Sequence, residues 1–255
     1  MNAAAIAALC RAAVDIEVVA ETGSTNADLM ARAARLARPT LLIAEHQSAG
    51  RGRAGRSWLS APGDSLTFSL AWKFDGSPQR LLGLPLAVGV ALADALAALE
   101  VPVQLKWPND VLKDGSKLAG ILIETQGAPR GGTWSVIGIG LNLSMPDQLE
   151  QRIGRSVASA PWLARMDRDA LMAALIDALA AAMDEFAHAG FGPFRARWDA
   201  LHAWRGQPVA VVDQGAVLQQ GVALGVDDGG RLLLDSDGVR VAVLAGDVSL
   251  RLGGS

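Results

Sequence analysis

The stretch VQLKWPNDVLKDGSKLAGILIET, residues 103–125, contains the clearest fold signal in the chain. Two largely apolar runs flank the dipeptide Asp114-Gly115, which is typical of the two-residue turn of a β-hairpin. We therefore expect strands over Val103–Lys113 and Lys117–Thr125. Pro108 lies inside the first run and cannot donate a backbone hydrogen bond, so it indicates a sheet edge, a bulge or a functional distortion.

The expected hairpin brings two charged residues to one face. Regular pairing puts Asp110 opposite Ala119 and Leu112 opposite Lys117. Asp110 and Lys117 are then diagonal neighbours, with Cα atoms roughly 7–8 Å apart. That spacing suits a ligand or a metal ion between the two charges better than a direct ion pair. An exposed surface pair without a function is an equal alternative.

Strands and helices are mixed along the rest of the first 200 or so residues. Thr25 followed by Asp28 resembles a capping box at the start of a helix. Because hairpins occur among the helices without strict alternation, the pattern favours an α+β fold built on a mixed β-sheet. We expect strands over Ile16–Ala20, Thr40–Glu45, Ser65–Phe74 and Trp134–Leu143, and helices over Ala27–Ala37, Leu81–Glu100 and Asp169–Ala189.

The pattern of apolar runs and turn residues changes near Trp204–Gln207. Five short apolar runs follow, separated by Asp, Gly and Gln turns, and they predict a small C-terminal SH3-like β-barrel. We expect one domain over residues 1–204 and the barrel over residues 205–255. The predicted barrel strands are Val209–Val212, Val217–Val226, Leu232–Leu234, Val239–Leu244 and Val248–Leu252.

Composition excludes several classes of protein. The 255 residues are 51% hydrophobic with a net charge of −3, so general attraction to nucleic acid or to membrane surfaces is not expected. A single cysteine, Cys10, excludes a disulfide framework.

The apolar run Leu81–Leu99 contains Pro85 and Asp94 and indicates a buried helix more than a membrane span. No secretory signal is evident, and we expect a cytoplasmic protein.

The loop GRGRAGR, residues 50–56, is the most unusual segment. Its three glycines allow successive backbone N–H groups to converge on an anion, and its three arginines add donors suited to phosphate or carboxylate. No Walker A motif is present, so nucleotide chemistry would need another phosphate site. A solvated loop without a function and an RNA-binding Arg-Gly segment are the alternatives; a single short copy is not typical of the latter.

The strand over residues 136–143 has two contrasting faces. Ile137, Ile139, Leu141 and Leu143 form one face, and Gly138, Gly140 and Asn142 form the other. The glycine face leaves room for something flat to approach the backbone, with Asn142 as a polar anchor. Tight packing of another element against the glycines is an equal alternative.

Taken together, these motifs resemble the biotin–protein ligase family. The resemblance covers essentially the whole chain, and the matching segments occur in the family's order. The segment before the first expected strand is too short for a helix-turn-helix unit, which points to the single-function class without an N-terminal DNA-binding domain. The matching segments are Ser24–Asn26, Gln47 with Gly50–Trp58, Lys106–Asp110, Lys117–Leu122, Gly138–Asn142 and Gly246–Arg251.

The resemblance implies an activity. A ligase of this family activates biotin with ATP as biotinyl-5′-AMP and transfers it to a lysine of a biotin carboxyl carrier protein domain. ATP and biotin are then substrates, and Mg²⁺ is expected. The implied fold is a class II synthetase-like catalytic domain of the biotin–lipoyl ligase type. The implied partner is the carrier domain of a carboxylase, and neither a specific nucleic acid nor a membrane is expected as a partner. We expect the enzyme to be a monomer or a weak homodimer.

The resemblance also implies the site residues. Catalysis falls to Lys117, Arg51, Arg53 and Asp110, with Asp110 a tentative metal or substrate-ordering residue. The residues implied for biotin are Ser24, Thr25, Asn26, Gln47, Arg51, Gly52, Arg53, Lys117 and Gly120. The residues implied for the nucleotide are Arg53, Arg56, Trp58, Lys106, Asn109 and Asn142.

Two other functions compete with this one. A lipoate–protein ligase or octanoyl transferase shares the superfamily fold but has a different glycine-rich arginine signature. A non-catalytic sensor of biotin or adenylate would not need both Lys117 and the full arginine loop. Biotin-dependent exchange of pyrophosphate into ATP separates an enzyme from a sensor.

Overall fold

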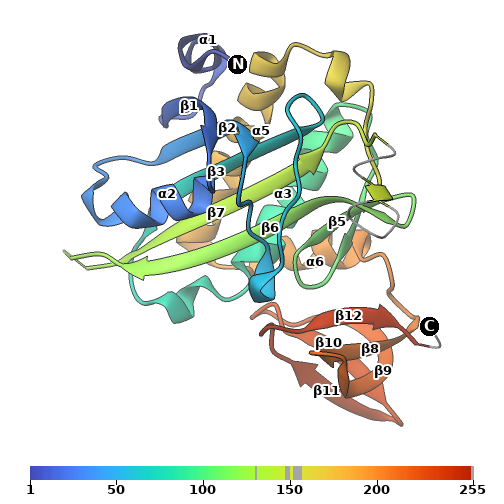
Figure 1. Ribbon diagram of the computed structural model, residues 1–255. Helices are drawn as coiled ribbons and strands as arrows, with labels where there is room; N and C mark the ends of the chain where they lie inside the picture. The colour runs from blue at the N-terminus through green and yellow to red at the C-terminus, as the bar shows by residue number, and fades with distance from the viewer. Residues whose placement is uncertain (130, 147–149, 152–156, 254–255) are drawn as a thin grey trace.

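The computed structural model describes residues 1–129, 131–146, 150–151 and 157–253, which form two β-sheets with most helices around the larger sheet (Figure 1). The larger sheet has the order β1-β2-β3-β7-β6-β5-β4. β1 runs parallel to β2, and all other neighbours are antiparallel, which confirms the expected α+β fold on a mixed sheet. Its strands are β1 Asp15–Thr22, β2 Thr40–Gln47, β3 Ser65–Phe74, β4 Gln104–Lys106, β5 Asp110–Lys113, β6 Ser116–Gly127 and β7 Thr133–Asn142.

The two faces of this sheet carry different layers. The apolar side chains of β7 join the main core with α3 and α5, because alternate residues of a strand point to opposite faces. The opposite face, with the glycines of β7, lies under α2 and the loop after β2 (Figure 1). The helices are α1 Ala3–Leu9, α2 Thr25–Arg32, α3 Leu84–Ala98, α5 Arg168–Ala189 and α6 Gly192–Leu201, with short 3₁₀ turns η1 Ala33–Arg35, η2 Arg53–Gly55, η3 Pro78–Leu81 and η4 Leu163–Arg165.

The predicted hairpin is present as β5 and β6. Asp114 and Gly115 both have positive φ, 50° and 76°, as a type I′ turn requires. Pro108 interrupts the first strand, so β4 and β5 are separate. The predicted register is wrong beyond Leu112, because a β-bulge puts Asp110 opposite Gly120 and not Ala119.

Helix boundaries differ from expectation at both ends of α2. Ser24 is the N-cap, since its hydroxyl oxygen accepts a hydrogen bond from the Ala27 N–H at 3.4 Å; Thr25 is the first helical residue. The helix ends at Arg32, and η1 replaces its expected last turn. α1 and α6 were not expected from the sequence.

One helical segment among the described residues, Pro78–Ala98, is long and apolar enough to cross a membrane. It has a mean hydropathy of 2.0 in its most apolar window, yet 67% of that window is buried. α3, which forms most of it, packs against α5 and α6. This segment is therefore the core helix that the sequence indicated.

The smaller sheet contains all five strands predicted for the C-terminal region. It is antiparallel, with the order β11-β10-β9-β8-β12. β11 and β12 form its edges, and no pairing closes them into a barrel within the described part of the chain. The strands are β8 Pro208–Asp213, β9 Ala216–Val226, β10 Leu232–Ser236, β11 Val239–Val243 and β12 Ser249–Leu252.

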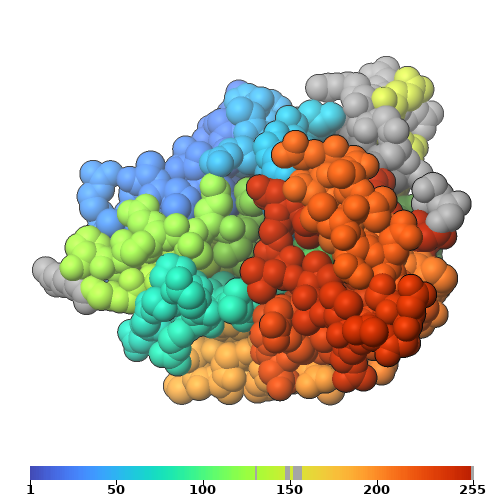
Figure 2. All heavy atoms as spheres, turned by 90° about the horizontal axis from the view of Figure 1, so that it is seen from below, coloured from blue at the N-terminus to red at the C-terminus, as the bar shows by residue number. Residues whose placement is uncertain are grey.

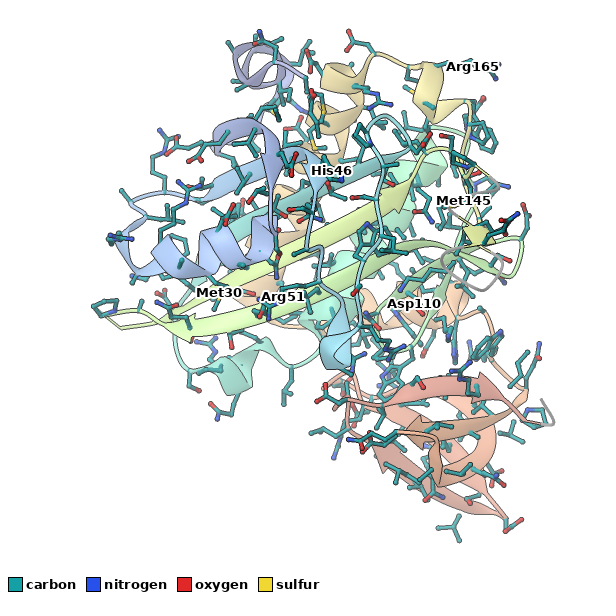
Figure 3. The ribbon with its side chains drawn as sticks, in the orientation of Figure 1. Met30, His46, Arg51, Asp110, Met145 and Arg165 are labelled. Carbon is teal, nitrogen blue, oxygen red and sulfur yellow. The ribbon has the colours of Figure 1, made fainter. Side chains whose placement is uncertain are left out.

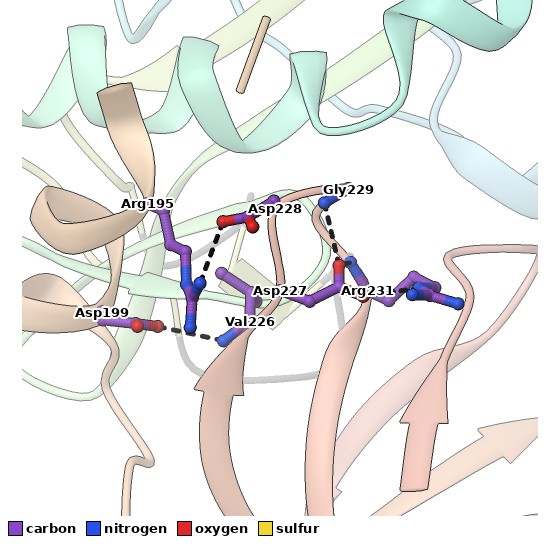
Figure 4. Close-up of polar contacts among 7 residues, drawn as sticks. All are labelled: Arg195, Asp199, Val226, Asp227, Asp228, Gly229 and Arg231. Atoms are coloured by element: carbon purple, nitrogen blue, oxygen red, sulfur yellow. Dashed lines mark hydrogen bonds and ion pairs between the residues drawn. The ribbon is translucent and has the colours of Figure 1, made fainter. Parts of the chain in front are cut away.

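Polar contacts from α6 attach the smaller sheet (Figure 4). The Val226 N–H donates to Asp199 Oδ1 at 3.0 Å, and Arg195 pairs with Asp228 at 2.9 Å. The turn between β9 and β10 is thereby held against α6.

The same turn reaches the larger sheet. The indole N–H of Trp107, between β4 and β5, donates to the Gly230 carbonyl at 3.2 Å. A Cβ at Gly230 would lie only 2.7 Å from the Gly83 Cα, so glycine permits this close approach. Figure 2 shows the C-terminal residues beside the segment around residue 80. The two sheets consequently meet next to the Lys106–Asp110 motif.

Candidate functional site

The start of α2 and the carboxyl end of β2 form a buried polar cluster. The Thr25 N–H donates to Gln47 Oε1 at 2.8 Å, and the Thr25 hydroxyl lies 3.1 Å from the same oxygen. Asn26 Oδ1 accepts a hydrogen bond from Ser69 Oγ at 2.7 Å. Ser24 caps the helix alongside. The structure thus brings together the four residues expected to hold the biotin ring, and it adds Ser69.

Side chains fill the glycine face of β7. A Cβ at Gly138 would lie 2.3 Å from Asn26 Oδ1, and a Cβ at Gly140 would lie 2.2 Å from the Trp58 indole. Gly120, opposite Gly140 on β6, carries Lys117 and the same indole above it. The flat group that approaches the backbone here is the Trp58 ring itself. Glycines are required because any larger residue would displace Asn26 or Trp58.

Three charged residues meet beside this indole. Lys117 Nζ lies 2.5 Å from Asp110 Oδ1, and Lys106 Nζ lies 3.4 Å from Asp110 Oδ2. The expectation of a gap between Asp110 and Lys117 is therefore wrong, because the Lys117 side chain extends over Gly120, the residue opposite Asp110, and so reaches the carboxylate. Lys117 Nζ is also 5.8 Å from the centre of the Trp58 ring.

Burial and charge act in opposite directions on this cluster. Burial raises the pKa of the Asp110 carboxyl, but attraction by Lys117 and Lys106 outweighs it and leaves that pKa below its ordinary value. Burial lowers the pKa of Lys106, and Asp110 opposes the shift. Asp110 is therefore an ionised acceptor that orders two lysines.

The glycine–arginine loop has a defined conformation. Its Gly52 N–H donates to the Arg56 carbonyl at 2.6 Å, and the Trp58 N–H donates to the Gly50 carbonyl at 2.9 Å. Ala54 has a φ of 53°, which is uncommon for a residue with a side chain. Some of the N–H groups expected to converge on an anion are thus used inside the loop.

Two arginines of this loop point to different partners. Arg51 lies in front of the larger sheet (Figure 3), and its Nη2 pairs with Glu124 Oε1 at 2.9 Å. Arg53 donates to Asn109 Oδ1 at 3.0 Å and to the Gly246 carbonyl, in the segment between β11 and β12. Burial lowers the pKa of Arg53. The loop therefore connects the larger sheet to the segment between β11 and β12.

Two asparagines expected at the nucleotide make internal bonds. Asn109 Nδ2 donates to the Ile121 carbonyl at 2.7 Å. Asn142 Nδ2 lies 3.4 Å from the Lys117 carbonyl and 3.2 Å from the Ala158 carbonyl. Both side chains brace the strands that carry the charged residues, which leaves fewer of their polar atoms for a ligand.

Two cavities border the loop. The larger, about 480 Å³, extends along β6 to Glu124 and to the segment between β11 and β12. The smaller, about 90 Å³, is strongly cationic. The sequence did not predict Glu124 or Arg251 at the site. For Arg251 a usable signal existed, because this residue ends the matching segment Gly246–Arg251. The cations that line the smaller cavity are Arg53, Arg56, Lys106, Lys117 and Arg251.

The side chains do not fit a resident Mg²⁺. Among the described residues there is no group of three or more His, Cys, Asp or Glu side chains able to hold a metal ion. Asp110, the tentative ligand, has a lysine ammonium on each oxygen. A dication there would face two positive charges, so the geometry argues against a metal site at Asp110.

Comparison with known proteins agrees with this geometry. Residues 17–143 match the Biotin/lipoate A/B protein ligase family, and residues 206–251 match the Biotin protein ligase C terminal domain. A biotin–[acetyl-CoA-carboxylase] ligase of Mycobacterium tuberculosis is 39% identical over 91% of this chain and 88% of its own length. The bifunctional ligase/repressor BirA of Escherichia coli is 35% identical over 92% of this chain and 74% of its own length.

A solved structure extends the comparison to the fold. The biotin protein ligase of Aquifex aeolicus, solved in complex with biotin and ATP, superposes with a TM-score of 0.77 and 26% identity. The match covers 93% of this chain and 99% of that protein. Both sheets are thus part of the shared architecture.

Proposed function

The chain belongs to the biotin/lipoate A/B protein ligase family, and we propose that it joins biotin to a lysine of a carboxylase's biotin carboxyl carrier domain at the cost of ATP. The observation that carries this proposal is the meeting of two environments on one sheet face. The Thr25–Gln47 cluster offers neutral donors and acceptors, and the Lys106–Asp110–Lys117 group offers positive charge. Biotin has a neutral ureido ring at one end and a carboxylate at the other.

The reaction has two steps. A carboxylate oxygen of biotin attacks the α-phosphorus of ATP, the bond to the bridging oxygen breaks, and pyrophosphate leaves. The neutral amine of the acceptor lysine then attacks the carbonyl carbon of biotinyl-5′-AMP, AMP leaves, and the nitrogen releases a proton. Because the first step brings two anions together, catalysis depends mainly on cations held in place before the reaction.

For the biotin end we propose recognition of the ureido ring by the polar cluster. Ser24, Thr25, Asn26 and Gln47 contact the ring, and Gly120 leaves room above β6 for the Lys117 side chain and the Trp58 indole that border the rest of the molecule. For the carboxylate we propose Arg51, Gly52 and Arg53 above it and Lys117 beside the reacting oxygens. Asp110 orders Lys117 and Lys106 and carries no metal in this scheme.

For the nucleotide we propose the cationic cavity. Arg53, Arg56, Lys106 and Arg251 take the phosphates, Trp58 packs against the nucleotide, and Asn109 and Asn142 hold the strands in place. Mg²⁺ enters with ATP as part of that substrate, and no step here depends on a protein-bound metal ion.

The loop over residues 50–56 is proposed as a lid. Arg51 and Arg53 would exchange their present partners for the carboxylate and phosphate of the intermediate. Closure would exclude water and protect the mixed anhydride from hydrolysis. Limited proteolysis tests this, because biotin plus ATP should suppress tryptic cleavage after Arg51, Arg53 or Arg56, and unchanged cleavage would refute closure.

The wider organisation follows the sequence expectations. We propose a catalytic domain over residues 1–204 and an SH3-like module over residues 205–255, whose strand order permits a partly open barrel. We also propose a cytoplasmic enzyme, a monomer or weak homodimer, without a specific nucleic-acid site. A sequence-specific DNA complex tighter than about 10⁻⁸ M would refute that last point.

Pyrophosphate exchange tests the function. Labelled pyrophosphate should enter ATP when biotin is present, but not with lipoate or octanoate, and a biotin carboxyl carrier domain should become biotinylated on lysine. Equal exchange with lipoate would assign the chain to the lipoate branch, and biotin binding without exchange would make it a sensor.

A further inference from the structure

Glu124 lies on β6 just beyond the Lys117–Leu122 motif and was not expected at the site. It shares a face with Gly120 and Leu122, because side chains two residues apart on a strand point the same way. Its two carboxylate oxygens have separate partners. Oε2 accepts from Asn26 Nδ2 at 2.9 Å, and Oε1 accepts from Arg51 Nη2 at 2.9 Å. One side chain thus joins the polar cluster to the arginine loop.

The Asn26 amide is held in one orientation by this carboxylate. An ionised carboxylate only accepts hydrogen bonds, so it must face the Asn26 NH₂ group. The Asn26 oxygen then faces Ser69, whose hydroxyl donates to it at 2.7 Å. With its proton used there, Ser69 accepts from the Thr25 hydroxyl, also at 2.7 Å. The direction of each hydrogen bond in the chain follows from the charge on Glu124.

Stability alone does not account for this arrangement. The side chain of Arg51 is 51% exposed and that of Glu124 is 25% exposed, and exposed ion pairs contribute roughly 0–1 kcal/mol. Asn26, by contrast, is only 3% exposed, so the orientation of its amide cannot be left to solvent. The contact with Arg51 is easily exchanged, and the contact with Asn26 is not.

We propose that Glu124 is a positioning residue for biotin: one carboxylate oxygen orients the Asn26 amide for the ring, and the other holds Arg51 over the same pocket. This inference rests on the proposed function. Glu124 itself transfers no proton and contacts neither the α-phosphate nor the acceptor lysine. Its effect is therefore on the affinity for biotin and not on the affinity for ATP.

The test uses Glu124→Gln, which keeps the size of the side chain but replaces one acceptor oxygen with a donor. The new NH₂ group must oppose either Asn26 or Arg51, both of which donate to this position. We expect the KM for biotin in pyrophosphate exchange, and the Kd for biotin measured calorimetrically without ATP, to rise about tenfold or more. The KM for ATP should stay within about twofold of the wild-type value. The urea midpoint of unfolding should stay near that of the wild type.

Glu17→Gln is the matched control. Glu17 forms a two-point ion pair with Arg32 at the other end of α2, at 2.6 and 2.9 Å, outside the site. This variant should leave both biotin constants unchanged. In an Asn26→Ala background, Glu124→Gln should weaken biotin binding less than it does in the wild type, because one of the two residues through which Glu124 acts is absent.

Several results would overturn the proposal. These are an unchanged biotin Kd in Glu124→Gln, a rise shared equally by biotin and ATP, or full additivity with Asn26→Ala. Should Glu124→Gln fail to fold, Glu124→Asp keeps the charge but cannot reach both partners, and an unchanged biotin Kd there would equally exclude a positioning role. Absence of biotin-dependent exchange in the wild type would instead refute the proposed function.

Discussion

We expect His202 to make the folded protein sensitive to mild acid. It follows α6 where the two sheets meet, is 6% exposed and lies with its ring 4.6 Å from that of Trp198. Within the described residues neither ring nitrogen has a hydrogen-bond partner. Burial, with repulsion by Arg205 as the smaller cause, lowers the pKa of His202 from 6.5 to about 4. The fold therefore accepts this imidazole only in its neutral form.

The size of the effect follows from linkage. The pKa is lower in the folded state, so the unfolded chain binds the proton more readily as the pH falls through 6.5. Above that pH both states are neutral and the residue contributes no pH dependence. With a pKa near 4, the loss of unfolding free energy from this one group is about 2 kcal/mol at pH 5 and about 3 kcal/mol at pH 4.

His202→Phe isolates this contribution. The replacement keeps an aromatic ring and removes two unpartnered buried nitrogens, so its stability at pH 7 should equal or exceed that of the wild type. Urea unfolding of both proteins at pH 7, 6, 5 and 4 gives the difference between them at each pH, in which shared carboxylate effects cancel. The advantage of the variant should grow by about 2 kcal/mol between pH 7 and pH 5. A constant difference across this range would refute the reasoning.

Three further predictions concern the site. Lys117→Ala should fold but lose biotin-dependent pyrophosphate exchange by about 2–5 kcal/mol of transition-state stabilisation, and normal exchange would exclude a catalytic role for Lys117. Arg53→Gly removes the contacts to Asn109 and Gly246 and should release the adenylate. The biotin label on bystander albumin should then rise about tenfold or more. Normal adenylate synthesis without such a rise would show that Arg53 does not retain the adenylate. Gly140→Val should displace the Trp58 indole and abolish exchange, with little loss of secondary structure by circular dichroism. Gly23→Ala is the control and should leave exchange unchanged, because there is open space around a Cβ at Gly23. An active Gly140→Val would show that exchange does not require Trp58 above Gly140.

Local signals predicted the elements of the fold well. The Asp114-Gly115 turn requires two positive φ values, and few other residues favour them, so the hairpin followed directly from the sequence. Alternation along β7 likewise identified the core face. Short elements such as α1 were missed because seven residues with only Ile6 buried carry almost no periodic signal.

Register and side-chain direction were the harder part. The bulge between Val111 and Leu112 depends on how β4, β5 and β6 pack together, and nothing in the hairpin sequence announces it. The direction of the Lys117 side chain, which extends over Gly120 to Asp110, was equally hidden, and it replaces the expected gap with an ion pair. The glycine face was recognised, but that Trp58 fills it could be known only once the loop after β2 was seen to fold back across β6 and β7.

Charge distribution explains why composition gave no hint of the site. The chain has a net charge of −3, yet its fold gathers cations from four separate segments around one cavity, and a sum over the sequence cannot register their proximity. Lys117 and Arg251 both lower the pKa of Lys106, so the assembled cations repel one another. Asp110, which pairs with both Lys106 and Lys117, offsets part of that repulsion. A polyphosphate ligand would relieve the remaining repulsion, and by mass action it stabilises the very arrangement that it needs in order to bind.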